Sequence, residues 1–332
     1  MKKIVLVGGS GFIGHNLALH LISKGHSVNI IDSFSVNNLL NFTDDEIPNK
    51  DLYRSILNNR IDLINQNNGK LIVEDARNYH SLSKIITSLN PDIVIHLAAV
   101  SHANKSNKTP HDTFDHSLRT LENVLDICKG IGCRLVYMSS SMVYGDFNGI
   151  EVDEDTVCKP KGIYGALKYA GEIIIKSYSE VFGLPYTIIR PSALYGERCV
   201  SRRVGQIFIE NIIQGKKITI NGDGEEKLDF TYIVDLVDGI EKACVSEKAI
   251  NQIFNITFGQ GRKINDLIKI LKSEFNEVNV EYKERDHLMP ERGTLSNKKS
   301  IELINYKSNY PIEIGYLKYI KWYRNFWGQL KK

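Results

Sequence analysis

The sequence lacks the features that mark secreted, membrane-spanning and strongly charged proteins. Its five cysteines are an odd number at irregular spacing, which argues against a disulfide framework, and Cys128 and Cys133 lack the second ligand pair of a zinc site. The first apolar run, Ile4–Val7, ends at a glycine pair, whereas a secretory signal core needs about 7–15 apolar residues and a membrane span about 20. The net charge is only +3 over 332 residues, which gives no reason to expect nucleic acid or a membrane as a partner. We therefore predict a cytoplasmic protein without a metal.

The sequence does have an alternation of apolar runs and helical patterns in its first half. Strands that are apolar on both faces and separated by helices predict a parallel sheet covered on both sides, a doubly wound Rossmann α/β fold. The predicted strands are Ile4–Val7, Val28–Ile31, Lys70–Val73, Ile93–Leu97, Leu135–Met138 and Tyr186–Ile189, and the helices between them are Asn16–Lys24, Leu82–Leu89, Leu118–Cys128 and Ile173–Val181.

After Pro191 the alternation becomes irregular, which predicts a smaller C-terminal lobe over the carboxyl edge of the sheet, where ligands bind in such folds. We assign residues 1–190 and roughly 231–258 to the nucleotide-binding domain, and 191–230 and 259–332 to a substrate-binding lobe. One polar stretch, 38–68, with a helical patch near Leu52–Ile64, is interpreted as a solvated insertion; a lid or an oligomer contact is the alternative.

A glycine-rich loop joins the first predicted strand to the first helix. Of Gly8, Gly11 and Gly14, one permits the tight turn, one lets the backbone approach a pyrophosphate, and one lets helix and strand pack closely. The helix that begins at Phe12 and Ile13 offers free N–H groups to phosphates. This position between a strand and a helix favours a dinucleotide-binding loop over a purely structural turn.

Asp32 ends the second predicted strand, 18 residues after Gly14. A carboxylate there accepts hydrogen bonds from ribose hydroxyls and repels a 2′-phosphate. Residues 33–40 contain no Arg or Lys that could receive such a phosphate, so the pattern favours NAD over NADP. Capping of the strand end is the alternative role for Asp32.

Tyr164 and Lys168 are four residues apart at the start of a predicted helix, so their side chains share one face. A nearby ammonium and the positive nicotinamide ring favour the phenolate, which could then accept a proton from a sugar hydroxyl. Such a pair is common on helix surfaces. The serines 139–141, directly after the strand Leu135–Met138, strengthen the hypothesis, because a serine there could hold the reacting hydroxyl; backbone capping is their alternative role.

Together these motifs resemble the extended short-chain dehydrogenase/reductase family, the NAD-dependent epimerases and dehydratases of nucleotide sugars. The resemblance covers nearly the whole chain. It rests on Gly8–Gly14, Asp32, Asp75, His96–Ala99, Ser139–Gly145, Tyr164–Lys168, Arg190–Pro191, Tyr195–Gly196, Gly222–Gly224 and Asp229–Phe230. It implies a homodimer formed through two helices per subunit, for which Leu118–Cys128 and Gly171–Val181 are the candidates.

The resemblance also implies roles for individual residues. Ser140 takes the catalytic Ser/Thr position, Tyr164 is the catalytic base, and Lys168 holds the nicotinamide ribose and lowers the tyrosine pKa. Asp75 and Ala76 would contact the adenine, and Leu97, Ala98, Ala99 and Pro191 would line the cofactor site.

On the substrate side, Ser141 and Met142 follow the catalytic serine, and Arg292 matches an arginine that reaches the nucleotide diphosphate. Lys227 lies beside Leu228, where the family usually has another arginine. Arg198, Arg202 and Arg203 form a basic cluster, for which phosphate binding and a solvated face are the alternatives.

Dehydratases of this family carry Asp-Glu where this chain has Ser141-Met142, which cannot remove a C5 proton. The resemblance therefore favours an epimerase that inverts C4 through a 4-keto intermediate. The alternatives are an oxidoreductase that releases its product and, from another class, a non-catalytic NAD-binding regulator. Ala193 and Ser117 stand where sugar-contacting asparagines are expected, so the sugar and its nucleotide stay open.

Overall fold

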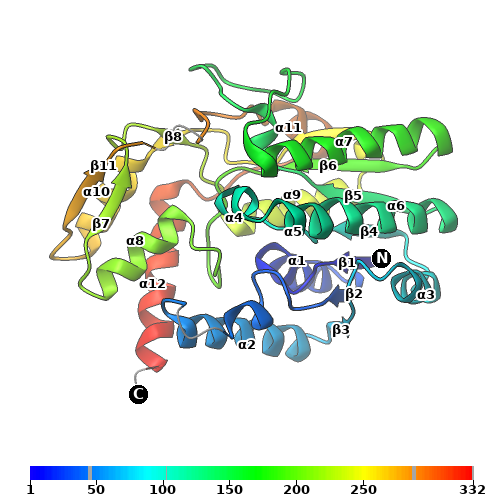
Figure 1. Cartoon of the computed structure of the whole chain (residues 1–332), viewed down its shortest axis with the longest axis horizontal. Helices are drawn as coiled ribbons and strands as arrows, with labels where there is room; N and C mark the ends of the chain where they lie inside the picture. The colour runs from blue at the N-terminus through cyan, green and yellow to red at the C-terminus, as the bar shows by residue number, and fades with distance from the viewer. Residues whose placement is uncertain (44–46, 102, 286–288, 331–332) are drawn as a thin grey trace.

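The computed structural model describes residues 1–43, 47–101, 103–285 and 289–330. Its centre is a parallel sheet of seven strands in the order β3-β2-β1-β4-β5-β6-β9, so the predicted Rossmann fold is confirmed (Figure 1). The chain order reverses between β1 and β4, and this reversal opens a crevice at the carboxyl edge of the sheet. The strands are β1 (Lys3–Val7), β2 (Ser27–Asp32), β3 (Lys70–Val73), β4 (Ile93–His96), β5 (Arg134–Met138), β6 (Tyr186–Arg190) and β9 (Gln252–Asn255).

The apolar strands are explained by helices on both faces of the sheet. Ile4 and Leu6 of β1 pack into one core, and Val5 and Val7 pack into the other, because successive side chains of a strand point to opposite faces. Helices α1 (Phe12–Ser23), α2 (Lys50–Gln66) and α9 (Ile233–Val245) cover the first face, and α3 (Tyr79–Leu89), α6 (Thr120–Ile131) and α7 (Gly162–Phe182) cover the second.

Helix α2 corrects the interpretation of residues 38–68 as a solvated insertion. Leu52, Ile56, Arg60 and Ile64 recur every fourth residue and are all buried. This stripe places α2 against α1, where it is the regular crossover helix between β2 and β3. The polar composition of residues 38–68 led to the wrong interpretation, because the polar residues of the helix lie on its solvent-facing side.

The remaining elements gather at the carboxyl edge of the sheet (Figure 1). The pair β7 (Ile218–Asn221) and β11 (Val280–Lys283) is parallel, and the pair β8 (Lys227–Leu228) and β10 (Arg262–Lys263) is antiparallel. The helices of this half are α8 (Val204–Ile213), α10 (Ile264–Glu274), α11 (Lys298–Ile304) and α12 (Ile312–Leu330). Between β4 and β5 lie α4 (Ala103–Lys108), α5 (Pro110–Phe114) and one π-helical turn (Asp115–Arg119) that runs into α6, while short 3-10 turns occur at Leu39–Phe42, Ser141–Tyr144 and Glu247–Ala249.

One buried carboxylate ties the two parts of the molecule together. Glu210 of α8 accepts hydrogen bonds from the hydroxyl of Tyr53 on α2 at 2.6 Å, from that of Tyr323 on α12 at 2.8 Å, and from the Gln206 amide at 2.8 Å. With the Asn49 amide, which donates to Glu210 at 3.0 Å, four neutral donors satisfy the carboxylate, so it is not buried without hydrogen bonds. In the described part of the chain, no helix is long and apolar enough to cross a membrane.

Candidate active site

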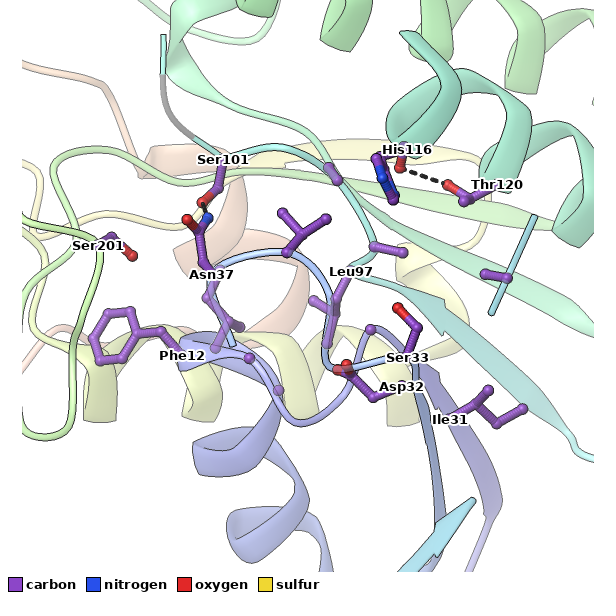
Figure 2. A pocket seen from close by; sticks show the side chains of 18 of the residues that line it. Phe12, Ile31, Asp32, Ser33, Asn37, Leu97, Ser101, His116, Thr120 and Ser201 are labelled. Carbon is purple, nitrogen blue, oxygen red and sulfur yellow. Dashed lines mark hydrogen bonds between the residues drawn. The ribbon is translucent and has the colours of Figure 1, made fainter. Parts of the chain in front are cut away.

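A pocket at the carboxyl edge of the sheet brings together eleven of the residues predicted to bind the cofactor (Figure 2). They come from the loops after β1, β2, β3 and β4, which converge because parallel strands end at the same edge. They are Gly8, Gly11, Phe12, Ile13, Gly14, Asp32, Asp75, Ala76, Leu97, Ala98 and Ala99.

The glycine loop has the close backbone packing that its sequence predicts. Gly8 has a φ of +78°, and a Cβ there would lie 2.6 Å from the Ala98 nitrogen. A Cβ on Gly14 would lie 2.4 Å from the Gly9 oxygen, so no side chain fits where the helix leaves the loop. Helix α1 begins at Phe12, its N-cap residue Gly11 provides no side-chain cap, and its first turn has no acidic residue. Its first N–H groups therefore remain available for a phosphate, and the pocket fits a dinucleotide.

Asp32 both caps the strand end and lines the pocket. Its Oδ2 accepts the Ser10 N–H at 2.9 Å and its Oδ1 accepts the Phe34 N–H at 2.8 Å. These two bonds fix the carboxylate without using all its lone pairs, so it can still accept ribose hydroxyls. The capping role and the cofactor role predicted for Asp32 are thus compatible.

Asp75 and Ala76 lie at the far end of the pocket. Arg77 donates to Asp75 through Nη2 at 2.7 Å, and this hydrogen bond lowers the pKa of the carboxyl. The Ala76 carbonyl accepts from Asn123 of α6 at 2.8 Å. Both contacts fix the loop after β3 beside the space expected for the adenine.

Several further pocket residues were not predicted from the sequence. In Figure 2, Asn37 from the loop after β2 meets Ser101 from the loop after β4, with 3.0 Å from Nδ2 to Oγ. His116 lies on the π-helical turn and its carbonyl accepts from Thr120 (Figure 2); such turns are frequent at functional sites. The other unpredicted residues of the lining are Ile31, Ser33, Val36, Arg60, Glu74, Leu194 and Ser201. Loop positions of this kind have no spacing that the sequence alone reveals.

The three serines after β5 point in three directions. Ser139 donates to Glu172 at 2.5 Å, within a buried pair in which Arg190 binds the same carboxylate at 2.9 and 2.6 Å. Ser140 begins a 3-10 turn, accepts the Met142 N–H at 3.2 Å and lowers the pKa of the Tyr164 hydroxyl. Ser141 accepts from Arg292. Of the three serines, Ser140 is therefore the one beside Tyr164, and its catalytic role stays a prediction.

The ionisation of Tyr164 depends on its burial and on two arginines. Burial raises the pKa of its hydroxyl, whereas Arg203, Ser140 and Arg292 lower it. A positive charge favours the phenolate, and Arg203 and Arg292 supply that charge in this structure. Neither residue is near Tyr164 in the sequence.

Lys168 is buried one turn along α7 from Tyr164. Its Nζ donates to the Met138 carbonyl at 2.7 Å and lies 4.9 Å from the centroid of the Tyr137 ring. Burial lowers its pKa to about 7, against the opposing effect of Glu172. The ammonium thus lies at the end of β5, and its predicted contact with the nicotinamide ribose stays a prediction, as does the cofactor contact of Pro191, whose carbonyl accepts the Ser141 N–H.

Arg292 lies directly against the pair that replaces the dehydratase acids. Its Nη1 is 2.7 Å from the Met142 sulfur, and its Nη2 donates to Ser141 and, at 3.4 Å, to Ser192. Its Nε is buried without a partner. All its described hydrogen-bond partners are neutral, and the carboxylates of Glu226 and Asp229 oppose the lowering of its pKa by burial, so Arg292 brings a positive charge to the site beside Tyr164.

The other predicted substrate residues lie elsewhere. Arg198 donates to Asn59 of α2 at 2.8 Å and stacks on Trp322 of α12. Arg202 donates to Tyr53 at 3.3 Å. Lys227 is exposed on β8. A role of these three in binding substrate stays a prediction; within the basic cluster, Arg203 is the arginine that lines the pocket.

Comparisons with known proteins identify the family of this chain. Residues 4–257 match the family model of the NAD dependent epimerase/dehydratase family. A putative UDP-glucose 4-epimerase of Methanocaldococcus jannaschii is 29% identical, over 97% of this chain and 98% of that protein. UDP-glucuronate 4-epimerase 1 of Arabidopsis thaliana is also 29% identical, over 98% of this chain and 77% of that protein.

Solved structures give the same result. UDP-glucuronic acid 4-epimerase of Bacillus cereus, in complex with UDP-glucuronic acid and NAD, superposes with a TM-score of 0.88 at 26% identity, covering 97% of this chain and 99% of that one. UDP-N-acetylglucosamine 4-epimerase of Methanobrevibacter ruminantium, in complex with UDP-N-acetylmuramic acid, superposes with a TM-score of 0.82 at 25% identity, covering 98% of both chains. The chain therefore belongs to the NAD dependent epimerase/dehydratase family, and NAD is its cofactor.

Proposed function

We propose that this protein is an epimerase of a nucleotide-activated sugar that inverts C4 through a transient 4-keto intermediate. The observation that carries the proposal is the placement of Tyr164 beside Ser140, with the neutral pair Ser141 and Met142 next to them and Arg292 against that pair. The relatives named 4-epimerases support the same reaction.

Tyr164 acts in this proposal as the base for the C4 hydroxyl. Ser140 holds that hydroxyl, and the charges of Arg203 and Arg292 favour the phenolate that accepts its proton. Bound NAD would supply the hydride acceptor and donor for C4, and Lys168 would hold the nicotinamide ribose. The proton on Tyr164 then returns to the sugar oxygen after the ketosugar has presented its other face.

Met142 is the residue that separates this reaction from dehydration. A dehydratase needs a carboxylate to remove the C5 proton, and a thioether bonded to Arg292 cannot do so. Without that step the 4-keto sugar is either reduced back to a hexose, as in an epimerase, or released. A net oxidoreductase that releases a ketosugar is the second candidate, because oxidation at C4 would use the same three residues, Ser140, Tyr164 and Lys168.

The test is turnover of UDP-, GDP-, CDP- and dTDP-hexoses by purified protein. An epimerase interconverts two sugars with no net rise in NADH absorbance, whereas a stoichiometric rise supports the oxidoreductase. Tyr164→Phe is expected to lower kcat by about 100-fold or more, since general-base catalysis contributes roughly 100- to 10,000-fold. Tyr169→Phe, the same change five residues along α7, is the matched control and is expected to leave kcat unchanged. If the Tyr164 variant turned over normally, the assigned base would be wrong.

The oligomeric state and the location of the protein belong to the same proposal. We propose a cytoplasmic homodimer, for which α6 and α7 are the candidate interface. Helix α7 exposes Ile173, Val181 and Phe182, which a partner helix could cover. Sedimentation of the wild-type protein and of an Ile173→Glu variant tests this, with dissociation to monomers expected for the variant.

A further inference from the structure

The cofactor pocket is lined by charges of both signs. Asp32, Glu74 and Asp75 are the acidic residues of the lining, and Arg60 and Arg203 are its two basic residues. In a dinucleotide, the ribose hydroxyls donate hydrogen bonds to acceptors such as carboxylates. The two negative charges of the pyrophosphate bind cationic donors. The two arginines are therefore matched to the pyrophosphate.

Arg203 reaches this pocket from the substrate lobe. It immediately precedes α8, and its Nη2 donates to the Ser101 carbonyl at 3.4 Å, across the gap between the lobe and the loop after β4. Ser201, two residues earlier, lies on the opposite side of the pocket from Asp32 (Figure 2). The Nε of Arg203 is buried without a partner, and no carboxylate in the described part of the chain forms an ion pair with this arginine.

Arg60 supplies a second charge of the same kind from α2. Its guanidinium is 1% exposed, and its described partners are the carbonyls of Arg198, at 3.1 Å from Nε, and of Ser10, at 3.5 Å from Nη1. Burial lowers its pKa to about 10, which leaves it charged at neutral pH. The carboxylate of Asp32 opposes this lowering, but the hydrogen bonds of the buried cation go to neutral carbonyls, and an anion in the pocket would offset the remaining cost of burial.

The neighbouring arginines of the cluster show that this placement is specific. Arg198 is engaged by Asn59 and Trp322, and Arg202 by Tyr53, so both point toward α2 and α12. Neither lines the pocket. The side chains of these three arginines, which lie within six residues, therefore point to different parts of the molecule. Of the three, only Arg203 lines the pocket and has a buried Nε without a partner.

We propose that Arg203 and Arg60 bind the pyrophosphate of NAD opposite the amides of α1, so that the cofactor is held by both lobes at once. Arg203 then closes over the phosphates from the substrate lobe, and NAD leaves only when the lobe separates from the loop after β4. Retention of NAD between turnovers follows from this closure. The inference rests on NAD being the cofactor and does not depend on which sugar is transformed.

The experiment measures nucleotide affinity rather than activity. NAD, ADP and adenosine are titrated into nucleotide-free wild-type, Arg203→Gln and Arg202→Gln protein, with calorimetric detection. A charge-assisted hydrogen bond is worth about 1.5–3 kcal/mol, so Arg203→Gln is expected to weaken NAD and ADP by about 10- to 100-fold. Adenosine, which lacks the pyrophosphate, is expected to bind both variants as it binds wild type, and Arg202→Gln is expected to bind all three ligands normally.

Two results would overturn the proposal. If Arg203→Gln bound NAD and ADP within about threefold of wild type, Arg203 would not contact the pyrophosphate. If adenosine weakened as much as ADP, the substitution would have damaged the pocket and the pyrophosphate contact would be refuted. Labelled NAD exchange gives a second readout, with faster release expected from Arg203→Gln and wild-type release from Arg202→Gln.

Discussion

The two halves of the active site are made from different parts of the polypeptide. The cofactor half is made largely of backbone: Gly8 and Gly14 allow close approach, and Asp32 is held by two main-chain N–H groups. The proposed substrate half relies on long side chains such as Arg292, which is carried by a loop and bonded to neutral groups. A site formed by the backbone requires particular residues at fixed spacings in the sequence. A site formed by long side chains can use a residue from any segment that lies close enough to reach it.

The largest effect on the free energy of unfolding is expected for substitutions of two buried carboxylates, Glu172 and Glu210, which have different hydrogen-bond partners. Glu172 is fully buried and pairs with Arg190, whereas Glu210 is bonded to hydroxyls and amides. Glu172→Gln leaves the Arg190 charge uncompensated and is expected to lower the free energy of unfolding by about 3–5 kcal/mol. Glu210→Gln breaks only neutral hydrogen bonds and is expected to cost about 1–3 kcal/mol. Urea unfolding of the two variants measures this difference, and equal losses would remove the distinction.

The next effect concerns the backbone itself. Gly14→Ala puts a Cβ 2.4 Å from the Gly9 oxygen, and neither backbone can retreat without moving the loop. We expect a loss of about 1–3 kcal/mol in stability together with loss of NAD binding. Gly130→Ala on α6, where no atom lies within 4 Å, is the control and is expected to be neutral or stabilising. NAD titration and thermal unfolding test the pair; a Gly14→Ala protein that bound NAD normally would contradict the close packing.

The smallest effect is a difference in pH dependence between the halves. Burial lowers the pKa of His96, on β4, to about 3, so its contribution to stability is complete above pH 6.5 and is lost as the pH falls toward 3. Burial raises the pKa of Asp229, in the substrate lobe, to about 6, so its contribution is complete below pH 3.8 and is lost as the pH rises through 6. Each slope is at most about 1.4 kcal/mol per pH unit.

Two substitutions test the pH dependence of stability that each of these groups contributes. Relative to wild type, His96→Asn is expected to gain stability as the pH falls from about 6.5 to 4, because it has no buried imidazole to charge. Asp229→Asn is expected to gain as the pH rises over about the same range, because it has no buried carboxyl to ionise. Urea unfolding across this range measures both, and parallel trends for the two variants would contradict the assigned pKa directions.

Prediction from the sequence was successful where local chemistry repeats along the chain. The apolar runs predicted the sheet, and Gly8–Gly14 with Asp32 predicted the NAD pocket that the structure and the relatives support. It was wrong for 38–68, because the buried stripe of α2 shares its helix with a polar face. It did not separate Arg203 from Arg198 and Arg202, since residues that are adjacent in sequence can point to opposite sides of a loop.

What the sequence by itself determined is therefore the fold and the cofactor, because backbone geometry and helical spacing are local properties; it also led to the proposed reacting groups Ser140, Tyr164 and Lys168. The tertiary structure alone decided which distant charges surround those groups. Arg60, Arg203 and Arg292 reach the site from α2, from the start of α8 and from the segment before α11. Their approach is set by the packing of separate elements, which no spacing in the chain encodes.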